Sequence, residues 1–215
     1  MNVVIIGAGG HGRVVLDILR LAGHHTPVGF IDADASLANT TVAGLPVLGP
    51  VNLLDKLRRQ DVRGAVVAIG DNRIRSSYAE LVGQCGLELV NAIHLSAVIS
   101  STVQLGRNTV IAAGAVVGTD ARIADSVIIN TSAVVDHECR IGSAVHICPG
   151  VLLAGRVVVE DGAFVGLGAK VLPCLRIGLH AIVGAGAVVL EDVPAAATVV
   201  GVPARVIKLP TAIAA

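Results

Sequence analysis

The chain has 215 residues, of which 53% are hydrophobic, so it is long enough for one or two domains with well-filled cores. Its 16 basic residues balance 16 acidic ones without any run of like charge, which argues against a nucleic-acid or anionic-membrane partner and favours a small ligand. The aromatic residues are two Phe and one Tyr, so the cores must consist of Val, Ile, Leu and Ala, and stacking on nucleic-acid bases is not expected.

The first residues and the cysteines bear on the cellular compartment. The N-terminus lacks the basic segment of a secretory signal, and every apolar run is interrupted by a Gly, a Pro or a charge before it reaches the length of a membrane span. The four cysteines show no Cys-x-x-Cys spacing, which favours thiols over disulfides or metal ligands. We therefore expect a cytoplasmic protein without a metal cofactor.

The first strand, turn and helix form a phosphate-binding pattern. Residues 2–6 (NVVII) are predicted to be a buried parallel strand, followed by the turn Gly7-Ala8-Gly9-Gly10-His11-Gly12 and a helix over residues 13–23. Glycines let the backbone approach a phosphate, and a helix N-terminus offers free N–H groups and a partial positive charge. A second strand, residues 28–31, ends at Asp32, where a dinucleotide-binding fold places the acid that binds a ribose. Alone, this pattern indicates a dinucleotide site.

The remainder of the N-terminal region is short for a complete dinucleotide-binding fold. Its predicted elements are a turn and short helix within residues 46–60, a strand over 64–69, a helix over 73–84 and a strand over 87–90. The first of these strands runs into the loop Gly70-Asp71-Asn72, and residues 91–96 are predicted to link the region to the rest. With about ninety residues, a mononucleotide-binding half domain fits better.

From Ile99 to Val193 an aliphatic residue returns at every sixth position. We call each of these aliphatic residues the lead of its hexad. The residue four positions after each lead is small or aliphatic, except for the polar Thr109. A period of six fits neither a helix nor a single strand; it is typical of a parallel β solenoid in which each hexad is a short strand plus a corner. Glycine follows the lead where a side chain would collide with a neighbouring coil, at Gly106, Gly118, Gly142, Gly166, Gly178 and Gly184.

The repeat Ile/Val/Leu-Gly-x-x-Ala/Val-x resembles that of the left-handed β-helix acyltransferases of the hexapeptide-repeat superfamily. The resemblance implies coils of three hexads, a left-handed turn and usually a trimer. Left-handed crossovers are rare in proteins, so the handedness is taken from the resemblance alone. Residues 201–205 (GVPAR) resemble the closing segment of many of these enzymes, which lies near the nucleotide end of coenzyme A.

The whole chain resembles bacterial sugar acetyltransferases that N-acetylate nucleotide-linked amino-deoxy sugars, with sialic acid O-acetyltransferases as relatives. The shared motifs are the GxGGHG turn, a Gly-Asx-Asn loop near residue 70 and a His-Glu or His-Asp pair in the repeats. The resemblance implies that His137 is the general base, Glu138 its orienting acid and His146 a contact of the thioester carbonyl. It also implies that Asn130 is a polar group near the base and that His11 and the glycines of the turn hold the nucleotide sugar.

The residues around His137 leave the orienting acid open. His137 lies two positions after a lead, at an expected corner, and Asp136 and Glu138 flank it. A carboxylate bonded to one ring nitrogen raises the basicity of the other, and either neighbour could serve. Without the resemblance, a surface histidine in a polar corner is the simpler interpretation. Gly155 follows His137 by three hexads, one expected coil, and should stack on it, leaving a slot for a thioester and an N–H for the oxyanion.

These patterns together predict three parts. An α/β, Rossmann-like half domain over residues 1–92 would bind the nucleotide sugar, a left-handed parallel β-helix over 93–194 would carry acetyl transfer, and a tail over 195–215 would lie near coenzyme A. The predicted contacts of the sugar nucleotide are Gly9, Gly10, His11, Asp32, Gly70, Asn72 and Asn130. The predicted contacts of acetyl-CoA are His146, Gly155, Leu167 and Ala185.

The expected reaction is acetyl-CoA-dependent N-acetylation of a nucleotide-diphosphate-linked amino sugar, at the 4-amino group of a 4-amino-4,6-dideoxyhexose, for surface glycans such as lipopolysaccharide. The alternatives are O-acetylation of sialic acid or a related sugar, and an NAD-binding or purely structural solenoid. His146 lies half a coil beyond His137, so the two should be more than about 10 Å apart on one chain. A site that uses both therefore predicts a homotrimer with shared sites.

Overall fold

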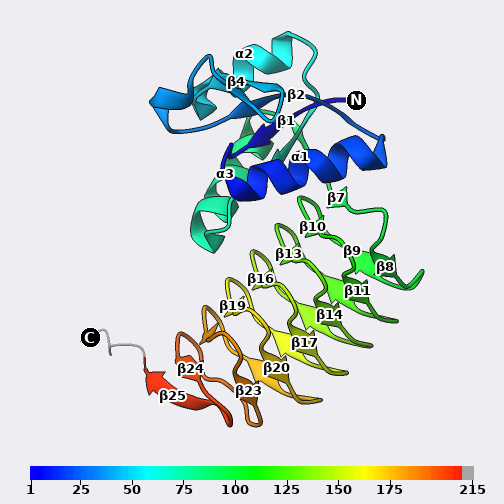
Figure 1. Cartoon of the computed structure of the whole chain (residues 1–215), viewed down its shortest axis with the longest axis vertical. Helices are drawn as coiled ribbons and strands as arrows, with labels where there is room; N and C mark the ends of the chain where they lie inside the picture. Colours follow the sequence, from blue (N-terminus) through cyan, green and yellow to red (C-terminus); the bar gives the residue numbers. More distant parts are fainter. Residues whose placement is uncertain (210–215) are drawn as a thin grey trace. The chain divides into compact units, whose positions relative to one another are not determined.

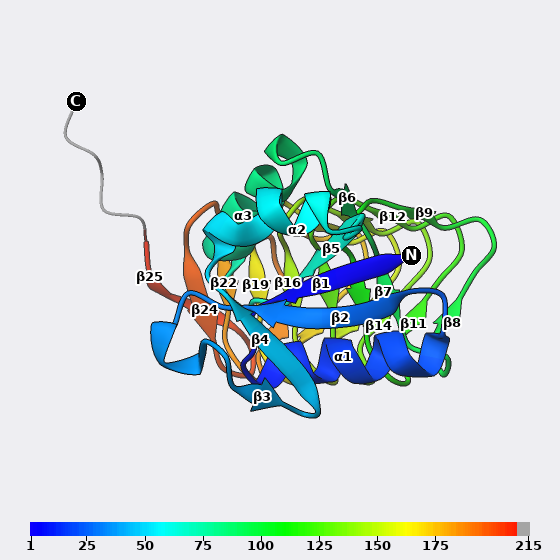
Figure 2. The same ribbon diagram turned by 90° about the horizontal axis from the view of Figure 1, so that it is seen from above.

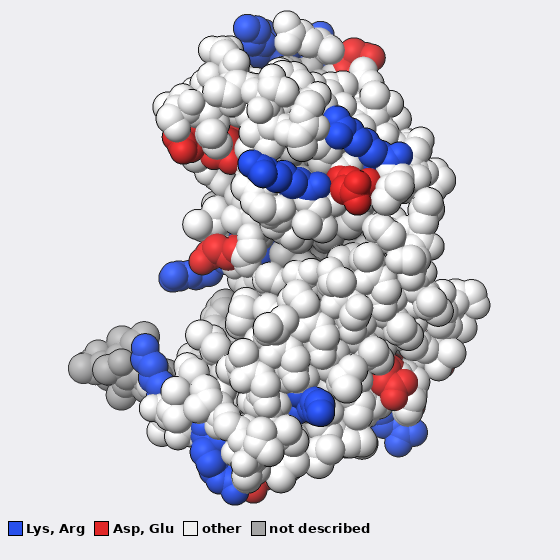
Figure 3. Space-filling model, in the orientation of Figure 1, with Lys and Arg blue, Asp and Glu red and all other residues white. Residues whose placement is uncertain are grey.

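The computed structural model describes residues 1–209 of the chain. They form two compact units (Figure 1): the first comprises Met1–Leu95 together with Arg107–Val110, and the second comprises Ser96–Gly106 and the chain from Ile111 onward. No helix among residues 1–209 has the length and apolar character that a membrane crossing requires. Acidic and basic side chains are interspersed on the face drawn in Figure 3, without a broad area of one sign among the described residues there.

A six-stranded sheet with the order β3-β4-β2-β1-β5-β6 forms the centre of the first unit. Its strands are β1 (Asn2–Ile6), β2 (Thr26–Ile31), β3 (Thr41–Val42), β4 (Leu45–Gly49), β5 (Gly64–Val67) and β6 (Glu88–Leu89). Neighbouring strands are parallel except β3 and β4, which form an antiparallel hairpin. The helices are α1 (Gly10–Ala22), α2 (Leu54–Arg59) and α3 (Asn72–Gln84), with short 3-10 helices η1 (Ala35–Leu37) and η2 (Val51–Leu53).

The predicted strands and helices of this unit are confirmed, but the hairpin of β3 and β4 was missed. Pro46 suggested a turn, whereas it is an exposed residue within β4, between the buried Leu45 and Val47. That alternation is typical of a strand with one buried face. The turn of the hairpin lies earlier, at Ala43 and Gly44, which both have positive φ angles.

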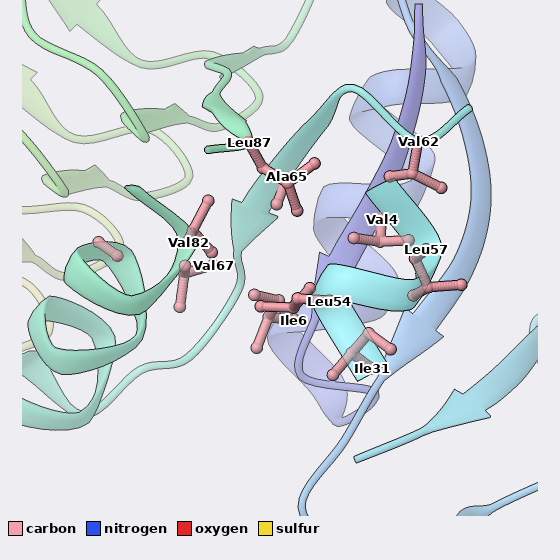
Figure 4. Packing of buried hydrophobic residues seen from close by; sticks show 11 residues of the cluster. Val4, Ile6, Ile31, Leu54, Leu57, Val62, Ala65, Val67, Val82 and Leu87 are labelled. Atoms are coloured by element: carbon pink, nitrogen blue, oxygen red, sulfur yellow. The ribbon is translucent and has the colours of Figure 1, made fainter. Parts of the chain in front are cut away.

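Helices cover both faces of the sheet in the first unit. Figure 2 shows α1 on one side of β1 and β2, and α2 and α3 on the other. On the side of α2 and α3, Val4 and Ile6 of β1 pack with Leu54 and Val82 in a buried cluster (Figure 4). Alternate residues of a strand point to opposite faces, so Ile5, which lies between these two, is directed to the side of α1. This double cover fixes β1 and β2 firmly, and the glycine turn follows β1 directly.

Three sheets of short strands build a parallel β-helix from the later part of the chain. The first sheet contains β7 (Ala92–Ile93), β10 (Val110–Ile111), β13 (Ile128–Ile129), β16 (His146–Ile147), β19 (Phe164–Val165), β22 (Ile182–Val183), β24 (Thr198–Val200) and β25 (Arg205–Lys208). The second contains β8 (Val98–Ile99), β11 (Val116–Val117), β14 (Val134–Val135), β17 (Leu152–Leu153), β20 (Lys170–Val171) and β23 (Val188–Val189). The third contains β9 (Gln104–Leu105), β12 (Arg122–Ile123), β15 (Arg140–Ile141), β18 (Val158–Val159) and β21 (Arg176–Ile177).

The pairing register confirms a coil of three hexads. Val116 pairs with Val134, and Arg140 pairs with Val158, so equivalent positions of successive coils are three hexads apart. Glycine at the corners is explained by the close approach of the next coil, because a Cβ on Gly118 would lie 2.7 Å from the backbone nitrogen of His137. Residue 109, the polar exception in the repeat, is a buried threonine whose N–H donates to the Asn91 side chain at 2.9 Å.

Both ends of the β-helix differ in detail from expectation. The predicted link over residues 91–96 contains a strand, β7, which belongs to the first sheet. The predicted tail has lost the period of six, yet β24 still extends this sheet, because a coil shorter than three hexads pairs Ile182 with Thr198. β25 then turns back antiparallel to β24. Residues 210–215, the end of the predicted tail, lie outside the described residues.

Candidate functional site

His137 lies in the corner between β14 and β15 and contacts the side chain of the residue that follows it. Its Nδ1 is 3.0 Å from Oε2 of Glu138, and both side chains are 47% exposed. The Nε2 atom of His137 makes no hydrogen bond to any residue in the described part of the chain. A histidine held by a carboxylate at one nitrogen and open at the other has the arrangement of a general base.

The two carboxylates that flank His137 have different hydrogen-bond partners. Oδ1 of Asp136 accepts the backbone N–H of His137 at 2.7 Å, so this carboxylate holds the main chain of the corner. Glu138 contacts the ring itself. Of the two possible orienting acids, the one that touches the imidazole in this structure is therefore Glu138.

Arg156 joins this pair, and sequence reasoning did not find it. Its Nε donates to Oε2 of Glu138 at 2.9 Å. The hydrogen bond from Arg156 and then that from His137 hold the pKa of Glu138 below its ordinary value. The signal was present in the sequence, because Arg156 follows Glu138 by three hexads, which is one coil.

Gly155 stacks on His137, as the spacing predicted, but no slot is left between them. A Cβ on Gly155 would lie 2.4 Å from Nε2 of His137 and 2.5 Å from its Cε1, so the imidazole occupies the space that a side chain would take. The N–H of Gly155 makes no hydrogen bond within residues 1–209. Gly155 is buried, so this unpaired backbone donor lies within the coil, next to the imidazole of His137.

Asn130 and His146 form a second polar group on another side of the coil. Nδ2 of Asn130 is 3.3 Å from Nε2 of His146. The His146 ring meets that of Phe164 edge to face, with centroids 5.3 Å apart. His146 belongs to β16 of the first sheet, whereas His137 follows β14 of the second, so one chain does not bring the two histidines together at one corner.

Leu167 and Ala185 lie at a third location. Both follow strands of the first sheet, β19 and β22, and they stack one coil apart: the N–H of Gly186 donates to the Leu167 carbonyl at 2.8 Å. Leu167 is 58% exposed. The four residues predicted to contact acetyl-CoA are thus spread over two corners and one sheet face of a single chain.

The first unit contains a cleft of about 410 Å³ at the ends of its central strands. Five of the residues predicted to bind the sugar nucleotide line it, namely Gly9, Gly10, His11, Asp32 and Gly70. The α1 helix begins at Gly10 without a side-chain cap and without an acidic residue in its first turn. An uncapped helix N-terminus in a cleft is suited to an anion such as a diphosphate. Tyr78 and Ile74 of α3 also line the cleft and were not predicted.

Asp32 and Gly12 shape this cleft from within the protein. Oδ2 of Asp32 accepts the N–H of Ala8 at 2.7 Å, and its Oδ1 accepts that of Asp34 at 2.9 Å, so this carboxylate holds the glycine turn. A Cβ on Gly12 would lie 1.9 Å from the Gly7 carbonyl oxygen. Gly12 is therefore needed for the close packing of helix and turn, while Gly9 and Gly10 face open space.

A buried arginine holds the loop at the other side of the cleft. Arg75 is fully buried and donates to the carbonyls of Ile69 and Gly70 at 2.9 and 3.1 Å. Burial lowers the pKa of Arg75 to about 10, so it stays charged at neutral pH. Asn72 does not line the cleft; its Oδ1 accepts from Arg75 at 2.8 Å. Sequence reasoning missed Arg75 because an arginine in a helix is normally exposed.

The cysteines and acidic residues offer little alternative chemistry. Cys139 and Cys148 are buried, and burial raises the pKa of each thiol to about 11, so neither is a thiolate nucleophile at neutral pH. Within residues 1–209, no group of three or more His, Cys, Asp and Glu side chains is placed to hold a metal ion.

Known proteins match both units. Residues 2–82 match the PglD N-terminal domain family. PerB from Caulobacter crescentus, solved with CoA and GDP-perosamine, is 46% identical, with a TM-score of 0.93 over 97% of this chain and 98% of that one. The acetyltransferase domain of PglB from Neisseria gonorrhoeae, solved with acetyl coenzyme A, is 35% identical, with a TM-score of 0.90 over 96% and 98%. WeeI from Acinetobacter baumannii is 30% identical, with a TM-score of 0.88 over 96% and 100%.

Curated relatives match a smaller part. A 2,3,4,5-tetrahydropyridine-2,6-dicarboxylate N-acetyltransferase from Staphylococcus aureus is 46% identical over 72 residues, and the match spans 30% of the length of each protein. The solved structures, in contrast, match both units from end to end, and their β-helix is the left-handed one that the resemblance implied. The chain therefore belongs to the sugar N-acetyltransferase family of the left-handed β-helix, hexapeptide-repeat superfamily.

Proposed function

We propose that the protein transfers the acetyl group of acetyl-CoA to the amino group of a nucleotide-diphosphate-linked amino-deoxy sugar, at the 4-amino group of a 4-amino-4,6-dideoxyhexose. The observation that carries this proposal is the end-to-end match, at 46% identity, to PerB solved with CoA and GDP-perosamine. The His137 corner supports it, because transfer to an amine needs a base and an oxyanion donor side by side.

Two groups of the His137 corner without a hydrogen-bond partner among the described residues, Nε2 of His137 and the N–H of Gly155, suggest a sequence of steps for acetyl transfer. The sugar amine attacks the thioester carbonyl carbon, and Nε2 of His137 takes the proton from the nitrogen as the C–N bond forms. The N–H of Gly155 donates to the developing oxyanion. The C–S bond then breaks, and His137 passes its proton to the departing sulfur. Glu138 keeps the Nδ1 proton in place throughout, since its lowered pKa keeps it ionised.

The cleft of the first unit is the proposed site of the nucleotide. Gly9, Gly10 and the N-terminus of α1 would bind the diphosphate, and His11 and Gly70 would contact the rest of the ligand. A cleft of about 410 Å³ fits a nucleotide moiety better than a complete dinucleotide. This disfavours the NAD-binding alternative.

We also propose that three copies share their active sites. His146, Leu167 and Ala185 lie on other sides of the coil from His137. A neighbouring copy would supply them to the same acetyl-CoA, and three such contacts close a ring in which every site is complete. Nucleotide sugars and acetyl-CoA are cytoplasmic metabolites, so the proposal places the enzyme in the cytoplasm, where it would serve the synthesis of surface glycans such as lipopolysaccharide.

The test is a direct assay with defined acceptors. The purified protein is incubated with acetyl-CoA and GDP-perosamine, or with UDP- and dTDP-linked 4-amino sugars, and the product is identified by mass spectrometry. Thiol reagents are unsuitable as the readout because Cys174 is exposed. One of these acceptors should gain a single acetyl group, whereas GDP-mannose, whose sugar carries hydroxyls and no amine, should not. Sialic acid is supplied in a parallel reaction. Acetylation of sialic acid alone, or of no acceptor at all, would contradict the proposal.

A further inference from the structure

Arg156 contacts the catalytic pair but takes no part in the steps above. Its Nε and the Nδ1 of His137 approach the same oxygen of Glu138, at 2.9 and 3.0 Å. Glu138 and Arg156 both occupy the corner position with positive φ, at 57° and 62°, on successive coils. Their backbones are therefore held in one orientation, and the two side chains leave the coil one above the other.

Without a second contact, the Glu138 carboxylate would have little reason to stay against the imidazole. The side chain is 47% exposed, and a solvated glutamate has several rotamers of similar energy. Arg156 is a directional donor that remains charged at any working pH. Its hydrogen bond to Oε2 selects the rotamer in which that oxygen also meets Nδ1 of His137.

The other charged groups near Glu138 do not replace this contact. Asp136 is engaged with the backbone of His137. The equivalent residue one coil before Glu138 is Asp120, and the one beyond Arg156 is Cys174. Neither Asp120 nor Asp136 donates a hydrogen bond as a carboxylate. Arg156 is thus the cation that faces Glu138 from the stacked coils in the described part of the chain.

We propose that Arg156 is a positioning residue for His137, acting through the carboxylate of Glu138 to keep the imidazole proton on Nδ1 and the base on Nε2. The kinetic part of this inference rests on the proposed function. The tautomer of His137 is a property of the free protein, so it is open to measurement whether or not acetyl transfer occurs.

The chain contains a matched control for this contact. Arg176 forms an ion pair with Glu160 elsewhere on the β-helix, again between an arginine and a glutamate at the surface. That pair is not in contact with His137. The variant Arg176→Gln therefore removes the same kind of ion pair without touching the proposed site.

The test compares Arg156→Gln, Arg156→Lys and Arg176→Gln with the wild type. Imidazole ¹⁵N NMR of the unliganded protein reports the tautomer of His137, with His137→Asn used to assign its signals. We expect Arg156→Gln to convert a predominant Nδ1–H tautomer into a mixture and to lower kcat about tenfold, with the KM of both substrates changed less than about twofold. Compared with Arg156→Gln, the variant Arg156→Lys should recover part of the Nδ1–H tautomer population and part of kcat. Arg176→Gln should change neither the tautomer of His137 nor kcat.

Wild-type ¹⁵N signals in Arg156→Gln would overturn the inference, as would an equal effect of Arg176→Gln. A wild type that transfers no acetyl group would overturn the proposed function alone, because the NMR result would still judge the role of Arg156.

Discussion

The two units position their functional residues by different rules. In the β-helix, a residue lies against the one a full coil later, as Glu138 does against Arg156 and His137 does against Gly155. In the first unit, the cleft is lined by residues from separate loops, such as His11, Asp32 and Gly70, at irregular spacings. In the proposed function, the chemistry therefore depends on direct stacking in the β-helix, whereas ligand recognition depends on loops in the first unit. Substitutions at the stacked residues of the His137 corner should affect kcat, whereas substitutions in the cleft of the first unit should affect KM.

The largest effect is expected at the proposed base. Replacing His137 with Ala should lower kcat about 100-fold or more and leave coenzyme A binding nearly unchanged, because only proton removal is lost. Steady-state kinetics and calorimetry with coenzyme A measure the two quantities. His180→Ala is a matched control, because His180 also stacks on a corner glycine, Gly162. This variant should retain the kcat of the wild type. Activity of His137→Ala within a few-fold of the wild type would exclude it as the base.

A methyl group at Gly155 should have the next largest effect. It would meet Nε2 of His137 at 2.4 Å, so the ring must move away from Gly155 and its backbone N–H. We expect Gly155→Ala to reduce kcat about 10- to 100-fold, in the range seen when an oxyanion donor is lost. Gly162→Ala likewise crowds a histidine ring, that of His180, and also places a side chain at a positive φ of 65°, so it should cost stability without lowering kcat. Equal kcat values in the two variants would show that stacking on His137 is irrelevant to catalysis.

Mixed oligomers test whether the separated residues of the β-helix act in one site. Inactive His137→Ala chains and inactive His146→Ala chains are unfolded together in equal amounts and reassembled. If each site takes one histidine from each of two neighbours, about one quarter of the sites in random trimers carry both. Activity near a quarter of the wild type is therefore expected, with each variant reassembled alone as the control. Mixed trimers without activity, or a monomer in light scattering, would refute the shared site.

The smallest effect is expected in the cleft of the first unit. A Cβ on Gly70 meets no atom within 4 Å, so Gly70→Ala should fold normally. The added methyl group would then crowd the bound ligand and not the protein. We expect the KM for the sugar nucleotide to rise about fivefold with kcat nearly unchanged. Gly83→Ala, within α3 and equally open, should leave KM unchanged and stabilise the helix by about 0.5–1 kcal/mol. An unchanged KM in Gly70→Ala would remove this loop from the binding site.

Much of the architecture was predictable because the β-helix follows a strict period of six and the first unit begins with a recognisable strand, glycine turn and helix. The period of six led to the corners and to the stacking of Gly155 on His137, and the glycine turn led to a cleft that contains Gly10 and Asp32. The hairpin of β3 and β4 was hidden because Pro46, which usually indicates a turn, is tolerated as an exposed residue of its strand.

The sequence by itself determined the hexad repeat of the β-helix and the order of the two units, because spacing and burial of aliphatic residues depend only on the backbone repeat. The tertiary structure decided which of the side chains that the spacing brings near one another form contacts, and through which atoms. Glu138 rather than Asp136 touches the ring, Arg156 completes the contact, and Arg75 turns inward to hold the loop at Gly70. The physical reason is that rotamers and hydrogen-bond partners follow from the local packing around each side chain, which is not periodic along the chain.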